Sequence, residues 1–293
     1  MTRIRRSLLF VPGNSPAMLL NAGVFGADSI IFDLEDAVAP NEKDAARILV
    51  RNAFRTLEYD QFEKIIRVNS RHSPFFTEDL QMLIPTLPDA ILLPKVEDKQ
   101  DIIDTETLME ALERDNNLPL GGIKIIPLIE TALGVENAFS IARSSKRISA
   151  LFLGAEDLTA DLGVKRTKKG KEILYSRGRI VIAARAAGIT AIDTPFTDVD
   201  DEKGLIKDAK FAKKLGFTAK ATISPRHVTT INRIFSPTEE EVLYAERVMA
   251  VIKKAEKEGK GVVALDGKMI DAPIVARAQR VLEIAQTLRG DLS

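Results

Sequence analysis

The chain has 293 residues, a length that one large barrel domain can reach. Its 42 basic and 42 acidic residues cancel, which removes any global electrostatic attraction to nucleic acid or to a membrane surface. It has no Cys, so disulfides and thiolate chemistry are excluded, as fits a reducing cytoplasm. No apolar run approaches the roughly 20 residues that a membrane-spanning helix needs. We therefore expect a soluble cytoplasmic protein that binds neither nucleic acid nor membrane.

Eight short apolar runs are typical of buried parallel strands, because they lack polar alternation. In chain order they cover residues 7–11, 29–33, 64–69, 90–95, 124–130, 150–154, 190–193 and 220–224. Polar segments with helical spacing lie between them, among them 41–57, 98–116, 172–187 and 200–215. A strand followed by a helix, eight times over, predicts a (β/α)8 TIM barrel. A doubly wound open sheet is the competing fold.

The barrel is predicted to occupy residues 1–235, and residues 236–293 form a C-terminal helical extension. The extension is expected to contain a helix at 238–258, a short strand at 262–265, a turn at Gly267 and a last helix from about Ala272. Because these elements are additional to a barrel, they are the part best suited to reach a neighbouring subunit.

Five of the apolar runs lead directly into residues that can carry chemistry. They lead into Glu35-Asp36, Arg67, Lys95, Glu130 and Glu156-Asp157. The carboxyl ends of parallel strands meet on one face of a sheet or barrel, where α/β enzymes place their active sites. The carboxylates, an arginine and a lysine at this face indicate a metal-assisted carbanion enzyme.

Glu130 and Asp157 follow consecutive predicted strands. Two hard oxygen ligands without nitrogen or sulfur favour Mg²⁺, which keeps several waters and takes other ligands from its substrate. The alternative is that each acid caps the helix that follows it.

Arg67 lies near the end of a predicted strand otherwise made of Ile and Val, so its charge must be paired. Glu35 or Asp36 could pair with it, either as a structural ion pair or to aim the guanidinium at a substrate oxygen that becomes negative. Lys95 could form a Schiff base, but its neighbours favour an electrostatic or structural role.

Other polar residues have simpler interpretations. Asp193 is predicted to be a turn residue, and His72 and His227 are expected at the surface. The basic segment 165–171 is either solvated or holds a phosphorylated carrier. Asp271, before Ala272-Pro273, is predicted on sequence grounds to be a helix N-cap.

Several strings together resemble the citrate lyase β-subunit family, also called the HpcH/HpaI aldolase or CitE-like group. They run in order over nearly the whole chain: Leu9-Phe10-Val11-Pro12-Gly13, Phe32-Asp33-Leu34-Glu35-Asp36, Arg67-Val68-Asn69, Leu93-Pro94-Lys95, Gly154-Ala155-Glu156-Asp157 and Gly267-Lys268-Met269-Ile270-Asp271. The resemblance implies a TIM barrel that assembles as trimers or hexamers. It also implies Mg²⁺-dependent cleavage or formation of a carbon–carbon bond in 3-hydroxyacyl thioesters.

The resemblance also implies roles for individual residues. It implies that Glu130 and Asp157 bind Mg²⁺ and that Arg67 contacts the substrate. It implies that Asp271 is the catalytic acid/base, delivered from a tail that covers an adjacent subunit's barrel.

Glu35 and Asp36 are then expected to orient Arg67 and metal-bound water as further catalytic residues. The expected substrate-binding set is Arg67, Glu130, Gly154, Ala155 and Lys95.

The expected reaction is retro-Claisen cleavage of a citryl-, citramalyl- or malyl-CoA type thioester to an acyl thioester and a 2-oxo acid such as oxaloacetate, pyruvate or glyoxylate. The residues after Asp157, and the segment 193–198, look more like those of free-standing CoA-ester lyases. One alternative is a citryl-acyl-carrier-protein lyase acting with citrate lyase α and γ subunits. Two others are an aldolase for free hydroxy-oxo acids and a catalytically silent structural barrel. A homo-oligomer is expected in each case.

Overall fold

The structure is a computed structural model that describes residues 4–257 and 263–290. The chain divides into two compact units. One contains Arg5–Asn232, and the other contains Arg233–Ser293 with Met1–Ile4.

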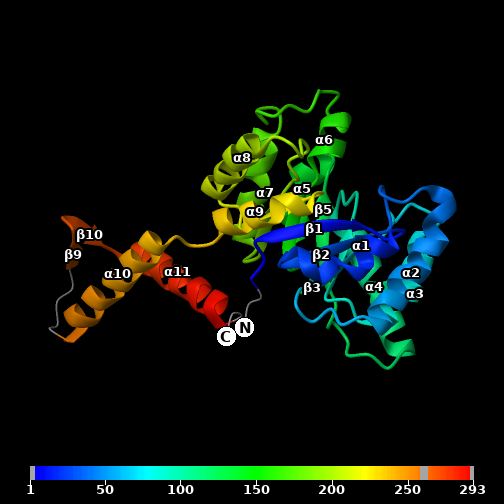
Figure 1. The fold of residues 1–293 in the computed structure, drawn as a ribbon, viewed down its shortest axis with the longest axis horizontal. Helices are drawn as coiled ribbons and strands as arrows, with labels where there is room; N and C mark the ends of the chain where they lie inside the picture. Colours follow the sequence, from blue (N-terminus) through cyan, green and yellow to red (C-terminus); the bar gives the residue numbers. More distant parts are fainter. Residues whose placement is uncertain (1–3, 258–262, 291–293) are drawn as a thin grey trace. The chain divides into compact units, whose positions relative to one another are not determined.

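The first unit is a closed barrel of eight parallel strands (Figure 1). The strands are β1 (Ser7–Pro12), β2 (Ser29–Asp33), β3 (Glu63–Arg67), β4 (Ala90–Leu93), β5 (Lys124–Ile129), β6 (Ala150–Leu153), β7 (Thr190–Asp193) and β8 (Ala219–Thr222). Each strand pairs with the next, and β1 pairs with β8, so the sheet has no free edge. The predicted TIM barrel is confirmed, and the open doubly wound sheet is excluded.

The strands are apolar along their length because both of their faces are buried. Alternate residues point into the barrel and form its central core, made of Leu8, Ile31, Ile65, Ala90, Leu92, Ile126, Leu128, Ala150, Phe152, Ile192, Ala219 and Ala221. The residues between them face the helices. For example, Phe32 packs edge-on against Phe54 of the helix Lys43–Thr56. The barrel interior is therefore filled with side chains, and a site can form only at its ends.

Helices connect the strands on the outside of the barrel (Figure 1). They are α1 (Pro16–Leu20), α2 (Lys43–Thr56), α3 (Phe76–Leu83), α4 (Lys99–Asp115), α5 (Ala132–Ala142), α6 (Ala155–Asp161), α7 (Leu174–Ala186), α8 (Glu202–Leu215) and α9 (Val228–Phe235). The predicted helices at 41–57, 98–116, 172–187 and 200–215 are confirmed as α2, α4, α7 and α8. The helices α7 and α8 are followed by Gly188 and Gly216, whose φ angles of 74° and 109° suit glycine.

The second unit is a helical hairpin that carries a small β-ribbon. It contains α10 (Glu239–Lys257), β9 (Val263–Leu265), β10 (Lys268–Ile270) and α11 (Ala272–Gly290). The strands β9 and β10 pair antiparallel across Asp266-Gly267, where both residues have positive φ as in a two-residue hairpin. The buried residues Ala245, Val248, Ile270 and Ala278 form its core. The predicted helix, strand, turn and helix are present, and residues 258 and 262 of that prediction lie outside the described residues.

No helix in the described parts of the chain combines the length and the apolar character that crossing a membrane requires.

Candidate active site at the barrel mouth

A pocket of about 450 Å³ lies at the carboxyl ends of the strands. Part of its lining is apolar and contains Phe10, Pro12, Met18, Ala37, Leu128, Phe152, Pro195 and Ile223. The rest is polar or small and contains Asp33, Asp36, Arg67, Glu130, Gly154, Ala155, Glu156, Asp157 and Thr194. Six residues expected at the site therefore share one pocket: Asp36, Arg67, Glu130, Gly154, Ala155 and Asp157.

Glu130 follows the last residue of β5, and its carboxylate is held from two sides. Its Oε1 accepts a hydrogen bond from the backbone N–H of Lys95 at 2.8 Å. A Cβ atom at Gly154 would lie 2.6 Å from Oε2, so this carboxylate packs closely against the glycine. Thr131, whose hydroxyl accepts from the Gly134 N–H, caps α5 instead. The alternative that Glu130 serves as a helix cap is therefore wrong.

Asp157 lies in the first turn of α6, whose N-cap residue is Gly154. The capping alternative is therefore wrong for Asp157 as well. Burial, with the charges of Asp157 and Glu35, raises the pKa of Glu130 from 4.5 to about 8, against the opposing effects of the Lys95 N–H and Arg67. Burial is the largest cause of the raised pKa, and the neighbouring acids Asp157 and Glu35 add to it.

The donor set fits a hard divalent cation. Glu130 and Asp157 offer carboxylate oxygens, and no group of three or more His, Cys, Asp or Glu side chains that could hold a metal occurs in the described residues. Mg²⁺ commonly uses one or two carboxylates and fills its other positions with water and substrate, whereas structural zinc takes four protein ligands. A bound cation would also relieve the repulsion between the two carboxylates. The residues present therefore fit Mg²⁺.

Arg67, the last residue of β3, is surrounded by carboxylates. Its Nε and Nη2 donate to the two oxygens of Asp33 at 2.7 and 2.6 Å. Its Nη1 lies 3.0 Å from Glu35 and 3.3 Å from Asp36, and its guanidinium stacks over Phe10 with a centroid distance of 5.0 Å. The expected partners Glu35 and Asp36 are present. Asp33 was missed, although the register pairs it directly with Arg67 at the ends of neighbouring strands.

The segment that carries Glu35 is fixed by hydrogen bonds to its backbone. Asp33 accepts from the N–H groups of Glu35 and Ala37. Buried Lys43 of α2 donates to the carbonyl oxygens of Leu34 and Glu35, both at 2.9 Å. Burial raises the pKa of Glu35 to about 7 against the opposing charge of Arg67, with Asp36 and Asp33 raising it further. The role of Lys43 could not be predicted from the sequence, because its contacts depend on how α2 packs.

Lys95 reaches the site through its backbone. Its side chain is exposed and is not among the pocket-lining residues. Its φ of 55° turns its N–H toward Glu130.

Other expectations have mixed outcomes. The predicted turn role of Asp193 is wrong, because Asp193 is the buried last residue of β7 and forms ion pairs with Arg177 and Lys220. His72 is exposed as expected, whereas His227 is buried and its Nε2 lies 3.3 Å from the Val199 carbonyl oxygen.

Asp271 caps α11, as the sequence predicts, since its carboxylate accepts from the Ile274 N–H at 3.1 Å. Two members of the basic segment 165–171 have acidic partners. Arg166 pairs with Glu172 at 2.9 Å, and Lys168 pairs with Asp201 at 3.0 Å.

A barrel whose mouth holds paired acids and a restrained arginine can place negative and positive charge around a substrate in one pocket. The sequence model of the HpcH/HpaI aldolase/citrate lyase family matches residues 6–225, and the chain belongs to this family. It is accordingly a carbon–carbon lyase of the oxo-acid class.

Among its relatives, citrate lyase subunit beta of Leuconostoc mesenteroides subsp. cremoris is 44% identical over 97% of this chain and 94% of the relative. The mitochondrial citramalyl-CoA lyase of Homo sapiens is 32% identical over 97% of this chain and 86% of the relative. A crystal structure of the protein CitE from Mycobacterium tuberculosis, in complex with magnesium, acetoacetate and coenzyme A, is 29% identical, with a TM-score of 0.79. It covers 98% of this chain and 100% of its own. The residues after Asp157 and the segment 193–198 look more like those of free-standing CoA-ester lyases. Over the whole chain, however, the identity to a citrate lyase β subunit is higher than the identity to citramalyl-CoA lyase.

Proposed function

We propose that this chain catalyses the Mg²⁺-dependent cleavage of a 3-hydroxy-3-carboxyacyl thioester, of the citryl-, citramalyl- or malyl-CoA type, to an acyl thioester and a 2-oxo acid. The observation that carries the proposal is that Glu130, Asp157 and Arg67 line one pocket at the barrel mouth. The related CitE structure, determined with magnesium, acetoacetate and coenzyme A, supports the same chemistry. Oxaloacetate, pyruvate or glyoxylate would be the 2-oxo acid.

Glu130 and Asp157 would hold Mg²⁺. The bound ion would act as a Lewis acid toward the hydroxyl and carboxylate oxygens of the part that leaves as the 2-oxo acid. Gly154 and Ala155 would form the adjoining wall of the substrate site, and the Lys95 backbone would keep Glu130 in place.

Cleavage leaves the bonding electron pair on the thioester fragment as an enolate, while the hydroxyl passes its proton to a carboxylate that lines the pocket and becomes the carbonyl of the 2-oxo acid. Arg67 lines the pocket and would stabilise the enolate oxygen, a contribution often worth about 3 kcal/mol. Its bonds to Asp33 hold the guanidinium in one orientation, and Glu35 and Asp36 support it from the other side.

Asp271 would deliver a proton to the enolate carbon, or remove one in the synthetic direction. It belongs to the second compact unit, and by resemblance we assign it to the site of a neighbouring subunit in a homo-oligomer. In this proposal residues 236–293 pack on that neighbour and cover its barrel mouth.

A second candidate is the citryl-acyl-carrier-protein lyase of a multi-subunit citrate lyase, which would act with α and γ subunits. The 44% identity to a citrate lyase β subunit favours it. Partner dependence separates the two candidates, since only the first predicts that purified protein cleaves a CoA ester alone. A silent structural barrel gives no reason for the acidic pair and Arg67 to line a common pocket.

The test is a panel of CoA thioesters with Mg²⁺, read by thiol release and by formation of the 2-oxo acid. We expect Glu130→Ala and Asp157→Ala to abolish Mg²⁺-dependent cleavage while the barrel stays folded by circular dichroism. Asp115→Ala, at an exposed position that ends α4, is the matched loss of one carboxylate and should leave cleavage unchanged. Undiminished turnover in either metal-site variant would overturn the assignment.

A further inference from the structure

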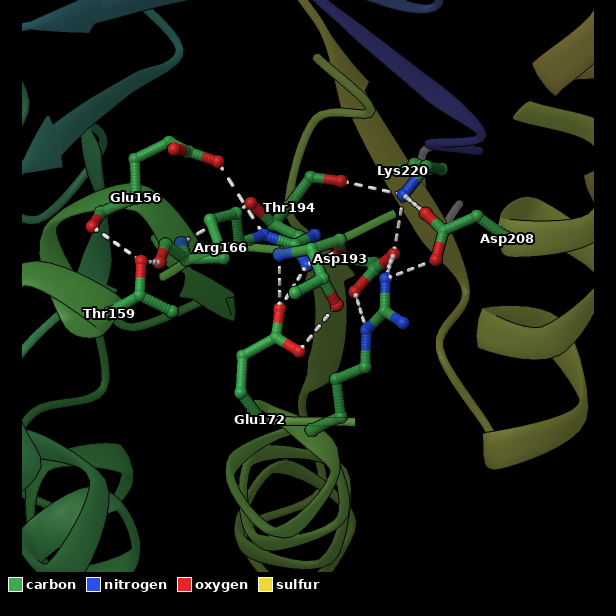
Figure 2. A network of polar contacts seen from close by, with 11 residues as sticks. Glu156, Thr159, Arg166, Glu172, Asp193, Thr194, Asp208 and Lys220 are labelled. Atoms are coloured by element: carbon green, nitrogen blue, oxygen red, sulfur yellow. Dashed lines mark hydrogen bonds and ion pairs between the residues drawn. The ribbon is translucent and has the colours of Figure 1, made fainter. Parts of the chain in front are cut away.

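Four charged side chains from four elements are buried together beside the pocket wall (Figure 2). Arg177 comes from α7, Asp193 from β7, Asp208 from α8 and Lys220 from β8. We call them the buried tetrad. The reaction proposed above uses none of them.

Lys220 donates each of its three protons to a different acceptor. Its Nζ lies 2.6 Å from Asp193 Oδ2, 2.6 Å from Asp208 Oδ2 and 2.7 Å from the Thr194 carbonyl oxygen. Arg177 binds both oxygens of Asp193 at 2.9 Å and the other oxygen of Asp208 at 2.8 Å. The two cations and two anions balance, and no donor of Lys220 is left over.

Stability alone does not account for such an arrangement. Removing four charges from water costs several kcal/mol per ion, and well-packed apolar side chains are often equally or more stabilising. A charged network with six hydrogen bonds can fix the relative position of the elements that carry it, although Nη1 of Arg177 has no hydrogen-bond partner within the described part of the chain. Here these elements are two strands and the two helices outside them.

The strands in this sector are joined by short ladders. Two residue pairs connect β7 with β8, as between β5 and β6, whereas five connect β1 with β2 and five connect β2 with β3. One of the two pairs is Asp193 with Lys220, so the tetrad begins where the backbone ladder ends. Toward the barrel mouth, β7 and β8 are therefore connected by the side chains of the tetrad.

One residue connects the tetrad to the pocket. Thr194 is almost fully buried, lines the pocket, and receives the Lys220 ammonium on its carbonyl oxygen. Its hydroxyl oxygen accepts the Ala155 N–H at 3.2 Å. Ala155 is the first residue of α6, the helix whose first turn carries Asp157.

We propose that the buried tetrad, acting through Thr194, sets the start of α6 so that Asp157 stands at the right position beside Glu130 to bind the metal. Thr194 and Lys220 are then positioning residues that touch no reacting atom. This inference rests on the proposed function, because it assumes that the two carboxylates bind Mg²⁺.

The direct test removes the hydroxyl acceptor and keeps the shape of the side chain. Thr194→Val should weaken Mg²⁺ binding to the metal-free protein by about tenfold, as is common for groups that orient metal ligands. Thr194→Ser keeps the acceptor and should retain the affinity of the unmodified protein. Isothermal titration with MgCl₂ measures both without any substrate, and a thermal melt shows that each variant is folded.

A second variant opens the tetrad without unbalancing its charge. Lys220→Met with Asp208→Leu removes one cation and one anion and frees the Thr194 carbonyl oxygen. We expect it to weaken Mg²⁺ binding to a similar extent. Adding Thr194→Val to it should cause little further loss, because both changes break the same connection.

The matched control is a buried ion pair between Glu113 of α4 and Arg147, which precedes β6 at the opposite end of the strands. Glu113→Leu with Arg147→Met makes the same exchange of an ion pair for apolar side chains, yet should leave Mg²⁺ affinity unchanged. Equal weakening by the control pair, or unweakened binding by Thr194→Val, would overturn the inference. Failure of the unmodified protein to bind Mg²⁺ would instead overturn the proposed function.

Discussion

At the scale of single residues, the position of Glu130 depends on the backbone of its neighbours. Lys95 adopts φ of 55°, a conformation that costs about 1 kcal/mol for a residue other than glycine, and so brings its N–H to the carboxylate. Gly154 leaves the space that the other carboxylate oxygen occupies. The Glu130 carboxylate is therefore held by the backbone of Lys95 and by the space that Gly154 leaves.

The packing of Gly154 predicts the effect of adding one methyl group. In Gly154→Ala the new Cβ would lie 2.6 Å from Glu130 Oε2 and 2.8 Å from its Cβ, so the carboxylate must move. We expect Mg²⁺ affinity to fall by about tenfold or more in a calorimetric titration. Gly178→Ala in α7 is the control, since nothing lies within 4 Å of its new Cβ, and it should bind Mg²⁺ normally. Equal affinities for the two variants would contradict the role of Gly154.

The raised pKa of Glu130 predicts a pH-dependent effect of the metal on stability. Its folded-state pKa of about 8 exceeds the ordinary 4.5, so the protonated group contributes to the free energy of unfolding. This contribution is fully present below about pH 4.5 and is lost as pH rises through about 8. Mg²⁺ stabilises the ionised form and offsets this loss. The Tm difference between protein in saturating Mg²⁺ and in chelator should therefore increase from about pH 6 to about pH 9.

Circular dichroism melts at several pH values measure this difference. Glu130→Gln supplies the control, because it removes the group that titrates near pH 8 and should reduce the pH dependence of the metal-free protein to the part contributed by Glu35, whose pKa is about 7. A Tm difference that is constant with pH would show that Glu130 does not titrate in this range.

At the scale of elements, the strands were predictable and the partners of the buried charges mostly were not. Buried parallel strands are apolar without alternation, so β1 to β8 could be located within about two residues from the sequence. The pairing of Arg67 with Asp33 was accessible too, since both residues end neighbouring strands in register. Arg177 and Asp208 come from different helices, and only the packing of these helices brings them together. Asp193 was therefore misread as a turn residue.

The pairing of the ends of β2 and β3 predicts how Asp33 acts on Arg67. Asp33→Asn leaves one acceptor oxygen and turns an amide N–H₂ toward the guanidinium, so Arg67 loses one of its two bonds. We expect kcat to fall about tenfold or more, with Mg²⁺ affinity unchanged, because the stabilisation of the enolate oxygen weakens. Asp36→Asn should have a smaller effect, since Asp36 is largely exposed and lies 3.3 Å from Arg67. The opposite ranking in steady-state kinetics would show that Asp36 is the main support.

At the scale of the whole molecule, the proposed chemistry is divided between two compact units. Arg67, Glu130 and Asp157 belong to the barrel, and Asp271 belongs to the C-terminal unit. The hairpin has a small core of its own and caps α11 with Asp271, so it can present that carboxylate as a unit. A homo-oligomer would let each hairpin serve a neighbour, and every site would then need residues from two chains.

Subunit mixing tests this division. Arg67→Ala removes the enolate-stabilising group from the barrel, and Asp271→Asn removes the acid/base from the hairpin, so each variant alone should be nearly inactive. If sites are shared, mixed oligomers formed from equal amounts should recover activity in about a quarter of their sites, where an intact barrel meets an intact hairpin. Mixing Arg67→Ala with the double variant Arg67→Ala/Asp271→Asn is the control and should recover none. If dissociated and reassembled mixtures of the two single variants stay inactive, Asp271 does not act on a neighbour.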